Sequence, residues 1–65
     1  MEVVERIEDF DKLAENKFLG VKPSLLNTKI TFKGTNNILF CEEGVNIEKS
    51  TINFNESNSL IYLGS

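Results

Sequence analysis

Cys41, Glu42 and Glu43 place the single thiol of the sequence beside two carboxylates. A reactive thiol needs a lowered pKa, which neighbouring Lys, Arg or His residues would supply, and no basic residue lies beside this group. The sequence contains no histidine, so the commonest general base and metal ligand is missing. We therefore interpret the acidic pair as a solvated corner and Cys41 as a small apolar side chain. We predict no catalytic, cofactor-binding or metal-binding residue in this chain.

Other polar residues that stand out by type have structural interpretations. Asn36 and Asn58 recur at an offset of 22, and stacked Asn side chains can hydrogen bond along a row and tolerate left-handed backbone angles. Asp9 and Asp11 have one residue between them, so on a helix they would point to different faces and would not share a metal ion. The sequon at 55–57 would accept a glycan only in a secreted protein. We interpret it as a chance match.

The composition limits the class of protein. A chain of 65 residues has room for one domain, and domains this small bury only about 60% of the surface of their unfolded chain. The net charge is −3 and the seven basic residues are scattered, which argues against a nucleic-acid partner. No apolar stretch approaches the ~20 residues that cross a bilayer, and the acidic N-terminus does not resemble a signal peptide. A single free cysteine suits a reducing compartment, so we expect a cytoplasmic protein.

Residues 2–16 have the spacing of an amphipathic α-helix. Val3, Ile7, Phe10 and Ala14 follow one another at intervals of four, three and four, which places them on one stripe. The acidic residues of the first turns favour the positive N-terminal end of a helix, and Pro23 prevents the helix from resuming. We predict a capping helix and linker over 1–22, which covers one end of the structure that follows.

From residue 23 the apolar residues alternate with a period of two, and the chain repeats itself at an offset of 22. Short runs rich in β-branched and aromatic residues alternate with turn compositions. The repeat pairs Leu25 with Ile47, Ile30 with Ile52, Phe32 with Phe54, Asn36 with Asn58, Ile38 with Leu60, and Phe40 with Tyr62. A fixed period of this length indicates a repeat architecture.

The repeat predicts that residues 23–65 form about two coils of a parallel β-helix, or β-solenoid. If each period makes one three-sided turn, equivalent runs stack about 4.8 Å apart as parallel strands, with Phe32 beside Phe54 in the core. An antiparallel meander of five strands is the alternative, but it does not require an offset of 22 and no two-residue Asn-Gly or Asp-Gly turn joins the runs. The expected fold class is mainly β: a parallel β-helix of about two 22-residue coils, with an N-terminal amphipathic α-helix as cap.

Residues 29–63 resemble a known family. The segments 30–40, 43–47, 50–54 and 58–62 are similar to the N-terminal coils of bacterial β-helix acyltransferases that modify surface polysaccharides, which resemble the hexapeptide-repeat O-acetyltransferases. The resemblance implies a left-handed β-helix, acetyl coenzyme A as donor, a sugar acceptor and assembly as a trimer. It covers the scaffold only. The catalytic histidine of that family has no counterpart here, so no site residue is carried over.

Two functions remain open at this stage. The chain is expected to be the N-terminal scaffold portion of a longer, acetyl-coenzyme-A-dependent O-acetyltransferase acting on a sugar or surface polysaccharide, and to be inactive alone. The alternative is a small non-enzymatic module that self-associates through the exposed edge of its last coil, residues 45–63, because such an edge is a template for another chain. In either case we expect a homo-oligomer, a dimer or trimer, with neither nucleic acid nor membrane as partner. Handedness, oligomer size and the acceptor sugar do not follow from the sequence.

Overall fold

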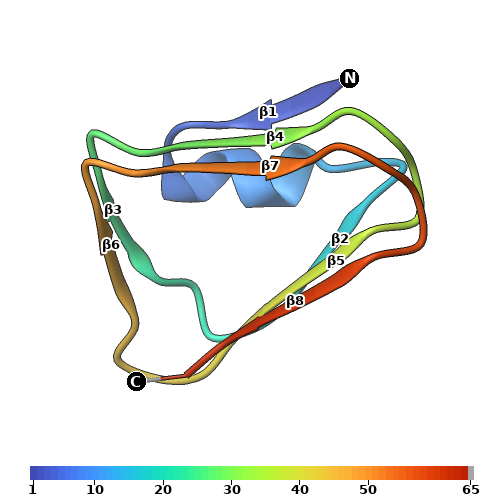
Figure 1. Ribbon diagram of the computed structural model, residues 1–65. Coiled ribbons are helices and arrows are strands. Elements are labelled where there is room, and N and C mark those ends of the chain that lie inside the picture. The colour runs from blue at the N-terminus through green and yellow to red at the C-terminus, as the bar shows by residue number, and fades with distance from the viewer. Residues whose placement is uncertain (65) are drawn as a thin grey trace.

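The computed structural model describes residues 1–64 and contains eight short β-strands and one short helix, while Ser65 lies outside the described residues (Figure 1). In chain order the elements are β1 (Glu2–Val4), the 3-10 helix η1 (Ile7–Lys12), β2 (Lys17–Gly20), β3 (Ser24–Leu26), β4 (Lys29–Phe32), β5 (Ile38–Cys41), β6 (Asn46–Glu48), β7 (Thr51–Phe54) and β8 (Leu60–Leu63).

These strands form three small sheets that make the three sides of a triangular outline (Figure 1). The sheets have the strand orders β1-β4-β7, β2-β5-β8 and β3-β6. From β2 onward the chain visits the three sheets in turn, so each strand after β4 lies beside the strand three elements earlier. The apolar side chains of all three sheets therefore point into one shared interior.

The strands after residue 23 pair in parallel at the predicted offset. Ile30 lies beside Ile52 and Phe32 beside Phe54 in the β4–β7 pair, and the β3–β6 and β5–β8 pairs have the same offset of 22. This register is confirmed, and it excludes the antiparallel hairpin between 30–32 and 38–40 that the meander required.

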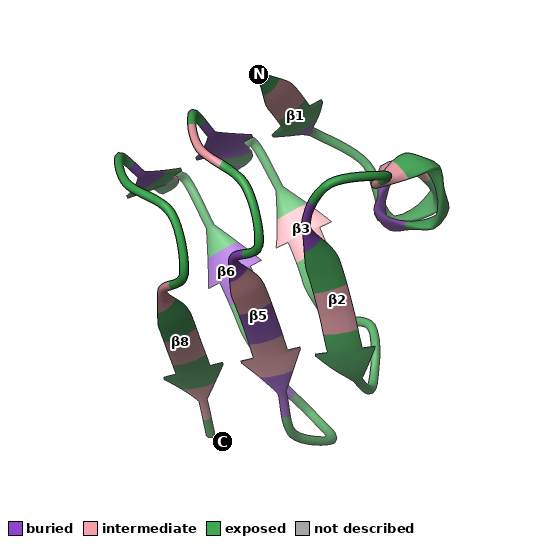
Figure 2. Cartoon of the chain, turned by 90° about the vertical axis from the view of Figure 1, so that its right-hand side faces the viewer, coloured by how far each residue is buried: buried purple, intermediate pink, exposed green. Residues whose placement is uncertain are grey.

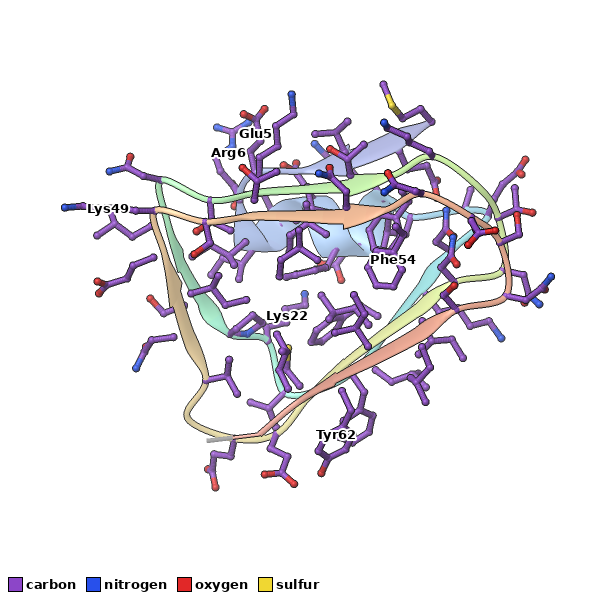
Figure 3. All side chains as sticks on the ribbon, viewed as in Figure 1. Glu5, Arg6, Lys22, Lys49, Phe54 and Tyr62 are labelled. Carbon is purple, nitrogen blue, oxygen red and sulfur yellow. The ribbon has the colours of Figure 1, made fainter. Side chains whose placement is uncertain are left out.

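Two aromatic rings stack in the centre of the core. The centroids of Phe32 and Phe54 are 4.6 Å apart with an interplanar angle of 12°, and the two residues are 0% and 2% exposed. Figure 3 shows the Phe54 side chain directed into the interior of the triangle. The predicted inward orientation of both rings is confirmed. The other buried apolar residues of the core are Val4, Phe10, Ile30, Leu39, Cys41, Val45 and Ile47.

The predicted fold class, two parallel β-helix coils capped by an α-helix, is wrong for this chain. Residues 1–64 form a small mainly-β domain of three small sheets with mixed pairing, and helix is limited to the six residues of η1. Residues 1–22 contribute two strands: β1, which together with η1 replaces the α-helix predicted over 2–16, and β2, which lies in the predicted linker. One of them, β1, runs antiparallel to β4, with Val4 opposite Ile30.

Tertiary pairing overrides the helical spacing of the N-terminal segment. In β1 it is Val4 that is buried, whereas Val3 and Ile7, both members of the predicted stripe, are exposed. Phe10 alone of that stripe is buried, and its ring lies 4.3 Å from the ring of Phe18. The β-branched pair at positions 3 and 4 suits a strand. The helix η1, which contains Phe10, lies across one end of the three sheets (Figures 1 and 2).

Strand β2 adds a third strand to the β2-β5-β8 sheet that the exact repeat did not predict. Lys17 lies beside Ile38, an offset of 21 in place of 22. The missing residue is in the corner: positions 21–23 join β2 to β3, whereas positions 42–45 join β5 to β6. Gly20, with a positive φ of 96°, leads into the shorter corner.

Candidate interaction surface

The outer face of the β2-β5-β8 sheet carries a row of apolar side chains. Along each strand alternate residues point inward and outward, and Figure 2 shows this alternation on β5, whose buried residues are Leu39 and Cys41. Pairing across the sheet places the outward residues in two rows: Lys17, Ile38 and Leu60 in one, and Leu19, Phe40 and Tyr62 in the other.

This outer face is partly covered at its middle strand and open at its edges. Ile38 and Phe40 are partly buried, whereas Leu60 is 63% exposed and Tyr62 is 56% exposed. Figure 3 shows the Tyr62 ring directed away from the interior. The rings of Phe40 and Tyr62 stack at 5.0 Å with an interplanar angle of 6°. We call these five residues, Leu19, Ile38, Phe40, Leu60 and Tyr62, the apolar face.

The outer faces of the other two sheets are mainly polar. On β4 and β7 the residues facing away from the core are Lys29, Thr31, Thr51 and Asn53. On β3 and β6 they are Ser24, Leu26, Asn46 and Glu48. In every sheet the inward-pointing residues form the core, and the core does not require the outward-pointing residues of the same strands to be apolar. The apolar face therefore needs an explanation of its own, because contiguous exposed apolar surface marks contact sites.

Opposite charges lie at the two ends of the apolar face. Lys17 begins β2 in the outward row, at the end where the strands start. Glu42 follows β5 at the other end, and its carboxylate accepts a hydrogen bond from the Tyr62 hydroxyl. That hydrogen bond raises the pKa of Tyr62 above its usual 10.0, with smaller contributions from partial burial and from the negative charge of Glu42.

Strands β6, β7 and β8 form a free edge of the three sheets. Within residues 1–64, no strand pairs with the outer side of these three strands. The backbone carbonyls of Ser50 and Phe54 accept hydrogen bonds from the backbone N–H groups of Lys29, in the neighbouring strand β4, and of Lys33, which directly follows β4. Because neighbouring residues of a strand direct their N–H and C=O groups to opposite sides, Thr51 and Asn53 present theirs to the free edge.

Asparagine side chains join successive strands at one corner. The predicted contact between Asn36 and Asn58 is confirmed, since the amide nitrogen of Asn36 donates to the side-chain oxygen of Asn58. Both residues have positive φ, 58° and 64°, as the tight corner requires. The predicted interpretation of these two residues as structural fits this geometry.

A second, buried asparagine pair at the same corner escaped the sequence analysis. The side-chain oxygen of Asn16 accepts from the backbone N–H of Asn37 at 2.9 Å, and that of Asn37 accepts from the backbone N–H of Ser59 at 2.9 Å. Their amide nitrogens donate to the carbonyls of Gly34 at 3.1 Å and Glu56 at 2.8 Å. Comparing the chain with itself at an offset of 21 would have aligned Asn16 with Asn37.

Cys41 belongs to the core, as predicted. It is fully buried and free, and burial raises the pKa of its thiol. Glu42 and Glu43 are exposed in the corner before β6. Their predicted position in a corner is confirmed, and the bond from Tyr62 to Glu42 is the contact that sequence reasoning missed.

Asp9 and Asp11 stabilise the N-terminal segment through contacts with different partners. The Asp9 carboxylate accepts from the backbone N–H groups of Glu5 and Arg6 at 3.0 and 3.1 Å, and those bonds, that of Glu5 first, lower its pKa. Asp11 pairs with Lys22 at 2.8 Å. Asp9 and Asp11 therefore bind different partners, and among residues 1–64 no group of three or more His, Cys, Asp or Glu side chains is placed to hold a metal ion.

Two surface hollows lie beside the N-terminal segment. One lies between Glu5 and the corner residues Asn27, Lys29, Ser50 and Thr51, and the other lies beside Glu2, Asn16 and Lys33. In the described part of the chain, every buried side-chain nitrogen or oxygen has a hydrogen-bond partner. Neither hollow therefore presents a buried polar group to a ligand.

Comparison with known proteins gives no match: none of the family models, curated proteins or solved structures is similar enough to this chain to support a relationship. Among the described residues, no helix has the length and apolar character needed to cross a bilayer.

Proposed function

We propose that this chain is a small non-enzymatic assembly module that self-associates through the free edge of β6, β7 and β8. The observation that carries the proposal is the set of three adjacent strands with unpaired outer sides. Such edges template the pairing of another chain, and proteins that remain monomeric protect them with charges, proline or bulges. The outward residues of β7, Thr51 and Asn53, offer neither charge nor proline.

At the opposite end the outer sides of β1, β2 and β3 are also unpaired within residues 1–64, but η1 covers the core there, and this cover favours a second copy bound through a two-fold axis. There β1 runs antiparallel along β4, and η1 lies across the end with Phe10 buried beneath it. Head-to-tail stacking would need that end to be uncovered. A two-fold contact uses the same edge in both copies, places the paired strands antiparallel and closes at a dimer.

Amide hydrogen exchange tests the edge directly. Ile52 points its N–H toward β4, whereas Asn53 points its N–H toward the free edge. In associated protein we expect the Asn53 amide to be protected, and to lose protection on dilution while Ile52 keeps it. If Asn53 exchanges at the unprotected rate in associated protein, the free edge is not the contact.

Asn53→Pro supplies a genetic test with a matched control. Proline removes the N–H that faces the edge and is tolerated on edge strands whose N–H faces solvent, so the variant should stay folded by circular dichroism and associate more weakly. Asn53→Ala removes the same side chain but keeps the N–H, and should associate as the parent does. Equal association of the parent and the folded proline variant would overturn the proposal.

As a second candidate, we propose that the chain is the scaffold portion of an O-acetyltransferase that modifies a sugar or surface polysaccharide. The support is the resemblance of residues 29–63 together with their parallel pairing at an offset of 22. The chain has no histidine, and its surface hollows offer no buried polar group to acetyl coenzyme A. The residues present do not fit that cofactor, so donor and acceptor would bind elsewhere in a larger protein.

Coding sequence beyond codon 65 tests this second candidate. Further periods of about 22 residues followed by a histidine-bearing segment would support it, and a stop codon would overturn it. The purified chain alone should not hydrolyse or transfer the acetyl group of acetyl coenzyme A; turnover free of contaminating enzyme would contradict the non-catalytic reading. The cytoplasmic location is likewise proposed, on the support of the free thiol of Cys41.

A further inference from the structure

The apolar face is a surface distinct from the free edge. It lies on the flat outer side of the β2-β5-β8 sheet, whereas the free edge presents backbone groups along the stacking direction of the strands. Leu60 and Tyr62, its most exposed members, are more than half exposed. We infer that the apolar face pairs two copies of this chain face to face, with Lys17 of each copy opposite Glu42 of the other.

The arrangement of charges selects a second copy as the occupant. Lys17 lies where the strands of this sheet start, and Glu42 lies where they end. A two-fold axis along the stacking direction turns the partner's strands antiparallel, so the start of one face meets the end of the other. The apolar rows then cover each other, and two Lys17–Glu42 pairs form at the rim.

Other occupants fit the same face less well. A membrane-surface element carries a cluster of Lys and Arg beside its apolar side, whereas here Lys17 is balanced by Glu42. A face that carries both charges, one at each end, is complementary to itself under two-fold rotation. Leu19, Leu60 and Tyr62 are 45%, 63% and 56% exposed on one face of the sheet, and contiguous exposed apolar side chains mark contact sites.

The experiment isolates this contact by using Asn53→Pro as the background, so that association through the free edge is weakened in every sample. Leu60→Ser removes an apolar side chain from the face, and Leu26→Ser, at a residue 53% exposed on β3, is the matched control. We expect Leu60→Ser to raise the dissociation constant about tenfold or more and Leu26→Ser to leave it within about twofold of the background.

Charge reversal then tests the two-fold geometry. Lys17→Glu and Glu42→Lys, made singly, should each weaken association roughly threefold to tenfold, because each creates two like-charge pairs in the dimer. The double variant restores opposite charges and should return to within about twofold of the background. The same reversals at Lys29 and Glu48, on the other two sheets, should have no effect.

Tyr62 gives an independent readout. It is the only tyrosine and the chain has no tryptophan, so intrinsic fluorescence reports on the apolar face alone. Its emission should change with protein concentration, with the same midpoint as sedimentation. Three results would overturn this inference: association that survives Leu60→Ser, a double charge variant that associates as weakly as the single variants, or Tyr62 emission that does not change with protein concentration. A folded background protein that binds vesicles of anionic lipid but remains monomeric would overturn it as well. These outcomes leave the free-edge proposal untouched, since that proposal is tested by the Asn53 amide.

Discussion

Asn37 is fully buried and lies just before β5. Its hydrogen bonds join the residues that lead into β2, β5 and β8, the three neighbouring strands of one sheet. It accepts from Ser59, donates to Glu56, and its own backbone N–H is bound by Asn16. Replacing it with Leu would leave the Ser59 N–H and the Glu56 carbonyl without these partners. We expect Asn37→Leu to lower the free energy of unfolding by about 2–3 kcal/mol, measured by urea denaturation.

Asn36 is the control for that prediction, because it lies next to Asn37 but is exposed, and its side chain bonds only to Asn58. Asn36→Gly, which removes the side chain but still allows the positive φ of 58°, should cost under about 1 kcal/mol. If the two substitutions had equal effects, the buried asparagines would not be what holds this corner together.

Glu2 couples stability to pH. Partial burial raises the pKa of its carboxyl, but hydrogen bonds from Ala14, Asn16 and Glu15 outweigh burial, so the folded pKa lies below the ordinary value of 4.5. A lowered folded pKa adds stability that is present above about pH 4.5 and is lost as pH falls through the folded pKa. In Glu2→Gln that component is absent at every pH.

The stability difference between parent and Glu2→Gln should therefore shrink between about pH 5 and pH 3. Thermal melts at several pH values measure it, with Glu43→Gln in an exposed corner as the matched control. A difference that stays constant across that range would show that the Glu2 carboxylate does not anchor residues 14–16 through its charge.

At the scale of elements, the β4–β7 pair holds the centre of the core through Phe32 and Phe54. Phe54→Ala should lower the free energy of unfolding by about 3–5 kcal/mol, a large part of the stability of a small domain. Phe40→Ala, the same substitution on the outward side of β5, should cost clearly less. Chemical denaturation measures the free energy of unfolding of both variants. Equal decreases in that free energy would mean that the inward and outward sides are assigned wrongly.

The elements after residue 23 could be predicted because each strand is specified by its own alternation and by its repeat. The repeat predicted the pairs Ile30 with Ile52 and Phe32 with Phe54, and these residues pair in the structure. The N-terminal elements could not be predicted this way. Val3, Ile7 and Phe10 satisfy a helical period, and only the presence of β4 decides that Val4 is buried as a strand residue.

Of the two candidate surfaces, the free edge could be predicted from the sequence and the apolar face could not. The sequence indicated that residues 45–63, the second of the two periods, would present a strand edge. The apolar face was not predicted, since Leu60 and Tyr62 belong to continuous apolar runs whose outward members are not distinguishable by type. Lys17 became part of that face only through β2, which pairs at an offset of 21.

For the whole molecule, the two ends of the described chain differ. At one end η1 lies across the core, whereas at the other end the free edge of β6, β7 and β8 is exposed, as is the apolar face on the side of the molecule, within residues 1–64. A domain of this size buries little surface by itself. Association through either surface would add burial that a single copy cannot reach.

Sedimentation equilibrium of the unmodified chain over a hundredfold range of concentration is the direct test of whether this chain is an assembly module. We expect a weight-average mass that rises above the 7.4 kDa of one copy and approaches a closed multiple of it. A well-folded species that stays at 7.4 kDa throughout would overturn the proposal, because the free edge and the apolar face would then both be compatible with a monomer.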